Sequence, residues 1–223
     1  FYKAELDAKK APFFSAFFNL SSHHPYTIPE QYKDIFDKGP LAIHESIGYS
    51  DFALQQFFKE AEKSAWFNNT LFVITADHTF KTTHKTYQNA NGLYAIPLMF
   101  YSPIDSLANI IDKVCQQADV LPSIIDYLNI DTSFVSFGNS IWNDKGFAVN
   151  YLNNIYQYFE EGHLLQFNGE ESIALYAVEK DSLLKNNLLL KRPELHQKME
   201  NHLKAYIQEY NHRMIHNKLE LNE

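Results

Sequence analysis

Apolar residues fall into short runs between polar loops, and their spacing predicts an α/β arrangement over the first part of the chain. The densely apolar run FFSAFFNL at residues 13–20 is predicted to be a buried strand, as are residues 71–76 and 94–103. Residues 44–67 place apolar side chains at mixed three- and four-residue spacings, which predicts a helix of roughly 18 to 20 residues. A helix, a short turn and an all-apolar strand in succession are typical of a parallel sheet covered on both faces.

The stretch NIIDKVCQQADVLPSIIDYLNI at residues 109–130 combines two patterns. Its first part is predicted to be an edge strand. From about Asp119 it is predicted to be a helix, because Asp is an acceptable N-cap and Pro122 then falls in the first turn.

From residue 137 onwards, short aromatic and β-branched runs alternate with Gly, Asn and Asp. Gly162 and the NGEE segment at 168–171 are predicted to be turns between antiparallel strands. The chain then ends in a long amphipathic helix, whose apolar stripe comprises Met199, Leu203, Tyr206, Ile207, Tyr210 and Met214. The pattern therefore predicts two parts: an α/β core over 1–135, and a small antiparallel sheet with a closing helix over 136–223.

Composition narrows the classes of function. The 223 residues carry a net charge of −8, which argues against nucleic acid as a partner because phosphate backbones attract clustered Lys and Arg. The aromatic residues, 18 Phe and 14 Tyr, are assigned to core packing rather than base stacking. The single cysteine, Cys115, cannot form an internal disulfide.

Neither a signal peptide nor an apolar run of membrane-spanning length is visible in the sequence. The chain begins without Met, and its first residues resemble the end of a helix already under way. We therefore expect the natural start, and any targeting or membrane segment, to lie upstream of Phe1.

Asp77-His78 directly follows the predicted strand at 71–76. A carboxylate and an imidazole in this position can both reach one divalent cation, and the mixed oxygen and nitrogen donors suit Mn²⁺ or Zn²⁺ better than Ca²⁺. The alternative is a polar turn or helix cap beside an exposed histidine. The dipeptide alone leaves both interpretations open.

A second candidate is the loop His23-His24-Pro25 after the first predicted strand. One imidazole there could donate to an anionic oxygen or shuttle a proton, although a polar loop without chemistry is the alternative. Past the Asp-His pair come Lys81, Thr82, His84 and Lys85. Cations and a hydroxyl beside a metal suit a phosphate or sulfate ester, but a solvated loop is the better interpretation of the two lysines.

The order of five segments resembles the C-terminal half of the sulfatase/alkaline-phosphatase-like superfamily, and within it the lipoteichoic acid synthase-like phosphoglycerol transferases. The segments are FFNLSSHHPYTIP, WFNNTLFVITADHT, GLYAIPLMFYSP, QADVLPSIIDYLNI and FGNSIW. The resemblance implies a mixed, mostly parallel sheet between helices, with a small antiparallel sheet and a long C-terminal helix. It also implies that Asp77 and His78 bind a catalytic metal, and that His23 contacts the transferred group. Thr82, and less directly His84, match positions that contact substrate.

The implied reaction is the transfer of a phosphoglycerol or phosphoryl group from a phosphodiester of a cell-envelope lipid or glycan. Mn²⁺ is the expected ion, with Mg²⁺ and Zn²⁺ as alternatives. A sulfatase or phosphodiesterase that hydrolyses an anionic sulfate or phosphate ester is the nearest alternative, and a non-catalytic sulfatase-like binding domain is another.

The family's nucleophile and its remaining acidic metal ligand precede all these segments, and no residue here matches either. We therefore expect this chain to be one piece of a longer enzyme and to be inactive by itself. The resemblance also implies a location on the extracytoplasmic face of the bacterial cell membrane, with an anchor in an upstream transmembrane region.

Overall fold

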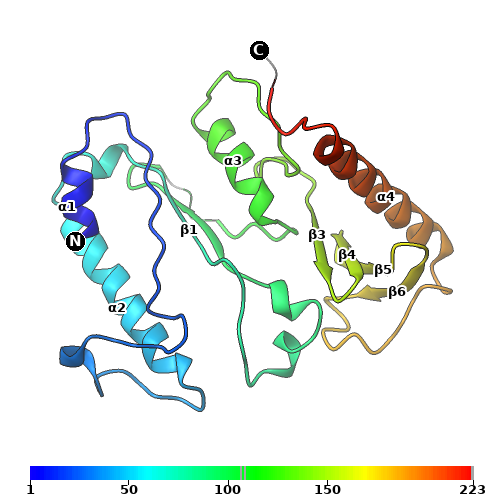
Figure 1. The fold of residues 1–223 in the computed structure, drawn as a ribbon, viewed down its shortest axis with the longest axis horizontal. Helices are drawn as coiled ribbons and strands as arrows, with labels where there is room; N and C mark the ends of the chain where they lie inside the picture. Colours follow the sequence, from blue (N-terminus) through cyan, green and yellow to red (C-terminus); the bar gives the residue numbers. More distant parts are fainter. Residues whose placement is uncertain (106, 108, 222–223) are drawn as a thin grey trace. The chain divides into compact units, whose positions relative to one another are not determined.

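The computed structural model describes residues 1–105, 107 and 109–221 (Figure 1). The chain divides into two compact units. The first unit comprises Phe1–Asp77 and Ile96–Asn109, and the second comprises His78–Ala95 and Ile110–Glu223. The predicted division of the chain into residues 1–135 and 136–223 stays a prediction.

The first unit contains helices and one small sheet. Its elements are α1 (Tyr2–Asp7), η1 (Glu30–Tyr32), α2 (Ile43–Ala61), η2 (Phe67–Asn69), β1 (Phe72–Thr75) and β2 (Leu98–Tyr101). The 19 residues of α2 confirm the predicted helix. The strands β1 and β2 confirm the predictions at 71–76 and 94–103, each with shorter bounds.

The strands β1 and β2 pair in antiparallel orientation, with Phe72 opposite Tyr101 and Thr75 opposite Leu98. This differs from the parallel pairing that the helix–turn–strand pattern indicated. An all-apolar run indicates that a strand is buried, but it does not indicate whether the neighbouring strand runs parallel or antiparallel to it. Aromatic side chains join α2 to the sheet: the ring of Phe58 lies 5.1 Å from that of Phe72 and 5.7 Å from that of Tyr101.

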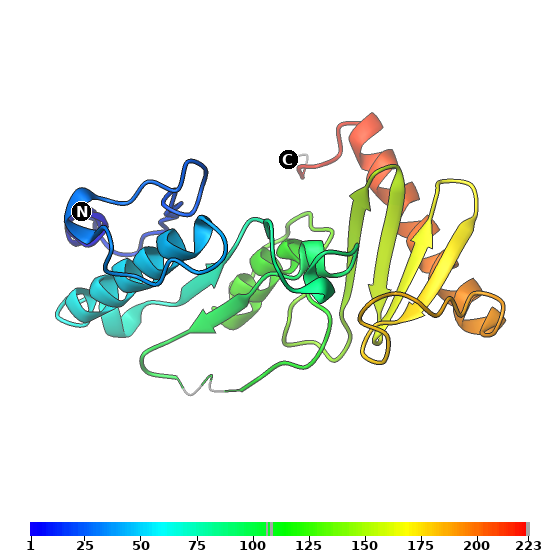
Figure 2. The same ribbon diagram turned by 90° about the horizontal axis from the view of Figure 1, so that it is seen from below.

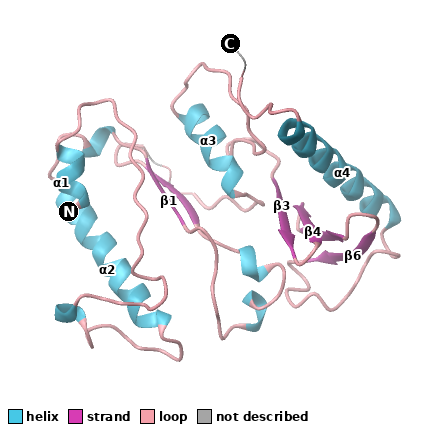
Figure 3. Cartoon of the chain, in the orientation of Figure 1, coloured by secondary structure: helices cyan, strands magenta, loops and turns pink. Residues whose placement is uncertain are grey.

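Residues 13–20 do not form a strand in this structure, so the predicted buried strand is wrong here. Figure 3 draws the segment as a loop. Phe14 is 84% exposed, and Phe18 and Leu20 are each 64% exposed. The apolar pattern is that of a strand, but a strand also needs a neighbour to pair its backbone groups. Among the described residues, no strand lies beside this segment to pair with its backbone.

The second unit contains a four-stranded antiparallel sheet in the order β3-β4-β5-β6. Its elements are η3 (Lys85–Tyr87), η4 (Gly92–Tyr94), η5 (Gln117–Asp119), α3 (Val120–Tyr127), β3 (Phe147–Leu152), β4 (Ile155–Glu160), β5 (His163–Phe167), β6 (Ser172–Ala177) and α4 (Pro193–Ile215). The predicted small antiparallel sheet and long C-terminal helix are thus confirmed.

Two predicted turns join these strands. Gly162, with φ of +70°, lies between β4 and β5, and the side chain of Asn168 accepts the backbone N–H groups of Glu170 and Glu171 at 2.8 and 2.9 Å. This local hydrogen bonding is what makes Asn a turn residue.

Helix α4 runs across one face of the four-stranded sheet (Figure 2). Met199 and Leu203 of α4 are fully buried and belong to one core cluster with side chains from β4, β5 and β6. The end of the predicted stripe lies outside this core, since Tyr210 is 42% and Met214 48% exposed.

The stretch before α3 differs from the predicted edge strand: no strand forms over residues 109–116. Hydrogen bonds from the side chain of Gln116 fix the end of this stretch, in place of the backbone hydrogen bonds of a β-ladder. The Gln116 amide donates to the carbonyl of Phe137 and accepts the N–H of Val149, both at 3.2 Å.

The predicted helix start at Asp119 is confirmed, and Pro122 falls in the first turn of α3. The Asp119 carboxylate does not cap α3 but accepts the N–H groups of Gln116 and Asn139, at 2.9 and 2.8 Å. Burial raises the pKa of Asp119, against the opposing effect of these hydrogen bonds. In the described part of the chain, no helix is both long enough and apolar enough to cross a membrane.

Candidate functional site

Asp77 and His78 follow the end of β1 by two and three residues. The strand end is held by Thr75, whose hydroxyl donates to the carbonyl of Pro97 at 2.9 Å. Asp77 and His78 are both exposed. A polar pair thus follows a strand whose own residues pack against aromatic side chains, as the sequence predicts.

The ring of His78 is oriented by the backbone of the next residue. Its Nδ1 lies 2.7 Å from the carbonyl oxygen of Thr79. Because a carbonyl accepts but cannot donate, Nδ1 must carry the proton in this contact, and the neutral ring then presents an unprotonated Nε2. A histidine that binds a metal is commonly oriented in this way, with its second nitrogen donating to a carbonyl or carboxylate.

The loop that follows, residues 79–95, is anchored within the second unit. The Thr79 hydroxyl donates to the carbonyl of Leu93 at 2.5 Å. The Asn89 amide donates to the carbonyl of Ser182 at 2.7 Å, and the hydroxyl of Tyr94 donates to the carbonyl of Tyr151 at 3.2 Å. Asn89 is not among the predicted site residues, although the Asn-Ala-Asn-Gly sequence at 89–92 is a turn signal.

Thr82 and His84 lie together in this loop. The Thr82 hydroxyl oxygen accepts the backbone N–H of His84 at 3.1 Å, and its carbonyl accepts the amide of Gln88 at 2.7 Å. Thr82 is half-buried, whereas His84 is exposed. The hydroxyl hydrogen of Thr82 remains able to donate to an anionic oxygen while its oxygen supports the turn.

His23 lies in a tight loop of the first unit. Its N–H donates to the carbonyl of Leu20 at 3.0 Å, and its own carbonyl accepts the N–H of Tyr26 at 2.7 Å. The His23 Nδ1 lies 2.8 Å from the carbonyl oxygen of His24, so this exposed ring also presents Nε2. The hydroxyls of Ser22 and Ser50 meet at 3.2 Å and tie the loop to α2.

The donor chemistry of Asp77 and His78 fits a divalent cation that accepts both oxygen and nitrogen ligands, such as Mn²⁺ or Zn²⁺. Among the residues that the structure describes, no group of three or more His, Cys, Asp and Glu side chains is placed to hold a metal ion. Two ligands do not close a metal site, so further ligands would be needed for tight binding.

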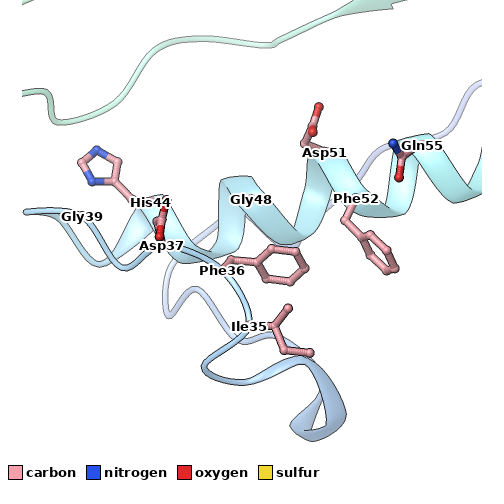
Figure 4. A pocket seen from close by; sticks show the side chains of 9 residues that line it. All are labelled: Ile35, Phe36, Asp37, Gly39, His44, Gly48, Asp51, Phe52 and Gln55. Carbon is pink, nitrogen blue, oxygen red and sulfur yellow. The ribbon is translucent and has the colours of Figure 1, made fainter.

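A separate groove of about 580 Å³ lies where residues 35–39 pass α2 (Figure 4). The rings of Phe36 and Phe52, 5.8 Å apart, form its apolar part, and Asp51 points away from them. None of the five predicted site residues lines this groove. It is therefore not part of the predicted chemistry.

The sequence model of the family described as Sulfatase matches residues 2–130 of the chain. Among curated proteins, lipoteichoic acid synthase 1 of Bacillus subtilis is 24% identical over 157 residues, which are 62% of this chain and 24% of the synthase. The lipoteichoic acid synthase-like YvgJ of the same organism is 26% identical over 194 residues, 74% of this chain and 31% of that protein. The chain thus spans about a quarter to a third of the length of these relatives.

Solved structures show the same fold. A protein in the alkaline phosphatase superfamily from Vibrio parahaemolyticus matches with a TM-score of 0.80 at 21% identity, over 98% of this chain and 53% of that protein. The phosphonate monoester hydrolase of Agrobacterium radiobacter matches with a TM-score of 0.55 at 16% identity, over 75% of this chain and 41% of the hydrolase. The α/β, alkaline-phosphatase-like fold class is therefore confirmed.

Proposed function

The chain belongs to the sulfatase family, and from this membership we propose that it is part of a metal-dependent phosphoglycerol or phosphoryl transferase. The proposed substrate is a phosphodiester of a cell-envelope lipid or glycan. The names of the curated relatives, lipoteichoic acid synthase 1 and a lipoteichoic acid synthase-like protein, support transfer over hydrolysis. The sulfatase match and these names support the enzyme class. The identity of the substrate is our proposal.

The observation that carries the proposal is the oriented ring of His78 beside Asp77 at the end of β1. Its Nδ1 contact with the Thr79 carbonyl gives the ring the orientation that is common among metal-binding histidines. We propose that Asp77 and His78 hold a divalent cation, Mn²⁺ in preference to Mg²⁺ or Zn²⁺. When bound, such an ion supplies Lewis-acid stabilisation of a phosphoryl oxygen and lowers the pKa of a bound hydroxyl.

We propose that His23 binds the anionic oxygens of the transferred group. Its Nδ1–H is held by the His24 carbonyl, so Nε2 is the atom that faces substrate. Protonated, it donates to a phosphoryl oxygen or to the leaving group. Thr82 is proposed to donate its hydroxyl hydrogen to the substrate, and His84 is proposed as a further substrate contact.

No residue of this chain is assigned as the nucleophile. We propose that a nucleophile and a further acidic metal ligand are supplied from outside this chain, and that the chain alone is inactive. The proposed location is the extracytoplasmic face of the bacterial cell membrane, reached through an anchor in another segment of the protein.

Two other functions fit the same family. A sulfatase or phosphodiesterase would present the same ligands to a tetrahedral anion. A Cys or Ser as the nucleophile would favour sulfate esters, whereas a Thr would favour phosphoryl transfer. A non-catalytic binding domain would keep the fold without the nucleophile.

The test uses the native-length protein, purified with Mn²⁺ and assayed on bis(4-nitrophenyl) phosphate and 4-nitrophenyl sulfate. Asp77→Asn and His78→Gln are expected to lose stoichiometric Mn²⁺ and to lower phosphodiester turnover by about 100-fold or more. Asp51→Asn, a matched change of an exposed carboxylate on α2, is expected to change neither.

Faster turnover of the sulfate ester would replace the transferase proposal with a sulfatase. Absence of bound Mn²⁺, together with unchanged turnover in Asp77→Asn, would exclude the proposed metal pair. Metal content and turnover are measured on the same samples, so the two results cannot be confused.

A further inference from the structure

Two histidines lie one turn apart at the C-terminal end of α4, which Figure 1 draws in dark red. His212 belongs to the last turn of the helix, and His216 is its C-cap residue. Both are exposed, and their ring centroids lie 4.4 Å apart with an interplanar angle of 35°. Residues four apart share one face of a helix, and two histidines at this spacing are the chelating pair of the His-Glu-x-x-His zinc motif. One divalent ion can therefore contact both rings.

Hydrogen bonds fix which nitrogen of each ring lacks a proton. The Nδ1 of His216 lies 2.8 Å from the carbonyl oxygen of His212, which can only accept, so the neutral ring presents an unprotonated Nε2. The Nε2 of His212 lies 3.4 Å from Nζ of Lys218. Because an ammonium group can only donate, this Nε2 is the acceptor and is unprotonated as well. Each ring thus offers the lone pair that a metal ion needs.

The ammonium group of Lys218 already places a positive charge at this pair. The segment after α4 turns back, so that the N–H of Lys218 donates to the carbonyl of Arg213 at 2.8 Å and Nη1 of Arg213 donates to the carbonyl of Lys218 at 3.1 Å. Arg213 is itself paired with Glu209 at 2.6 Å. These bonds hold Lys218 beside His212, and an ion that binds Nε2 must displace its ammonium group.

The position of the pair and the type of its donor atoms together select the ion. The pair lies at the C-terminal end of a 23-residue helix, where the aligned peptide dipoles favour positive charge. Imidazole nitrogens suit Cu²⁺, Ni²⁺ and Zn²⁺, whereas Mg²⁺ and Ca²⁺ prefer oxygen ligands. Among divalent ions of the first transition row, Cu²⁺ forms the most stable complexes with such ligands.

We propose that His212 and His216 form a chelating site for a divalent transition-metal ion of the copper, nickel and zinc group. Each ring binds the ion through Nε2, and water completes the coordination. Lys218 is a competing cation, whose ammonium group moves into solvent when the ion binds. The site is separate from Asp77 and His78, so the proposal does not depend on the proposed reaction.

Two other arrangements could involve the same histidines. In one, the rings only support the end of the helix, since the carbonyl of His212 accepts both the N–H of His216, at 3.1 Å, and its Nδ1–H. In the other, the pairs of two copies of the chain share one ion with four imidazole ligands. Charge disfavours the second arrangement, because each copy would bring the ammonium group of Lys218 to the same ion.

The test is a titration of Cu²⁺ into the native-length protein carrying Asp77→Asn, so that the proposed metal pair does not compete. Electron paramagnetic resonance is expected to show one Cu²⁺ per chain bound by two nitrogen atoms. His212→Gln and His216→Gln are each expected to weaken this binding about tenfold or more. His196→Gln is the matched control on the same helix, because Nε2 of His196 is held by Glu200 at 3.0 Å, and it should bind Cu²⁺ normally.

Lys218→Gln tests the competing cation. Removal of a positive charge beside the ion is expected to tighten Cu²⁺ binding about tenfold. Because Lys218 and both histidines are exposed, the circular dichroism and Tm of all three variants without metal are expected to match those of the unmodified protein. Zn²⁺ should bind more weakly than Cu²⁺, and Mg²⁺ should not compete with it.

Three results would overturn the proposal. Unchanged Cu²⁺ affinity in both His212→Gln and His216→Gln would leave the rings as a support for the helix end. Half an ion per chain, with dimers that light scattering detects only when Cu²⁺ is present, would assign the ion to two copies. Equal affinities of Lys218→Gln and the unmodified protein would exclude the competing role of Lys218. Because every titration uses the Asp77→Asn protein, failure of the proposed metal pair would leave these outcomes unchanged.

Discussion

Ser172 on β6 donates a hydrogen bond from its hydroxyl to the carboxylate of Glu200 on α4 at 2.6 Å. The same carboxylate also accepts hydrogen bonds from His196 Nε2, at 3.0 Å, and from the ammonium group of Lys204. A partly buried acid therefore joins the edge strand of the sheet to the helix that covers it.

This network makes the contribution of Glu200 to the free energy of unfolding depend on pH. Burial would raise the pKa of Glu200, but the hydrogen bonds from Lys204, Ser172 and His196 outweigh burial and lower it from 4.5 to about 2. A depressed pKa in the folded state stabilises the protein above the unfolded value, and this contribution is lost as the pH falls from about 4.5 to about 2. Glu200→Gln is expected to lower the free energy of unfolding at pH 7 by about 1–2 kcal/mol after solvent screening.

Urea unfolding at several pH values checks this prediction. The acid-dependent loss between about pH 4.5 and pH 2 should become shallower in Glu200→Gln. Glu209→Gln, which removes an exposed i,i+4 pair with Arg213 on the same helix, serves as control. Equal pH slopes for Glu200→Gln and the unmodified protein would contradict the assignment.

The buried and exposed ends of α4 are expected to respond differently to truncation. Leu203 is fully buried in the sheet–helix core, so Leu203→Ala should cost about 2–5 kcal/mol through lost burial and a residual cavity. Met214 is 48% exposed, so Met214→Ala should cost less than about 0.5 kcal/mol. Thermal or urea unfolding measures both, and similar losses would show that the end of the stripe is covered in solution.

Gly92 is expected to be essential to the loop at residues 79–95. An added Cβ would lie 2.2 Å from the carbonyl oxygen of Thr86 and 2.3 Å from the Cα of Tyr87, both backbone atoms. Gly92→Ala should therefore displace the loop and speed its amide exchange at least tenfold. Ala95→Ser, at an exposed position of the same loop, should leave exchange unchanged. Unchanged exchange in Gly92→Ala would mean that this close approach is absent in solution.

His23 and His24 offer a matched test of substrate contact. If His23 binds the transferred group, His23→Gln should lower kcat of the native-length protein by about 10²- to 10³-fold. Bound Mn²⁺ should stay unchanged. His24→Gln changes the neighbouring exposed imidazole and should have little effect on kcat. Equal losses from both substitutions would indicate a general effect on the loop.

Sequence alone determined the elements whose causes are local. The apolar spacing predicts α2 and α4, because a helical face repeats with a period that neighbouring residues already show. Gly162 and Asn168 predict their turns, because positive φ and side-chain-to-backbone hydrogen bonds are properties of those residues. The Asp77-His78 pair and the His23 loop are visible for the same reason, as polar residues placed just past apolar runs. Their chemical roles came from the resemblance, not from the pattern.

The tertiary structure decided which segments find partners. The pattern of residues 13–20 predicts a strand, but forming one depends on a neighbour that the segment itself does not encode. The antiparallel pairing of Phe72 with Tyr101, and the holding of Gln116 by Phe137 and Val149, likewise depend on residues distant in sequence. Periodicity reports how much surface a segment can bury, whereas direction, register and hydrogen-bond partners are set by whatever packs against it.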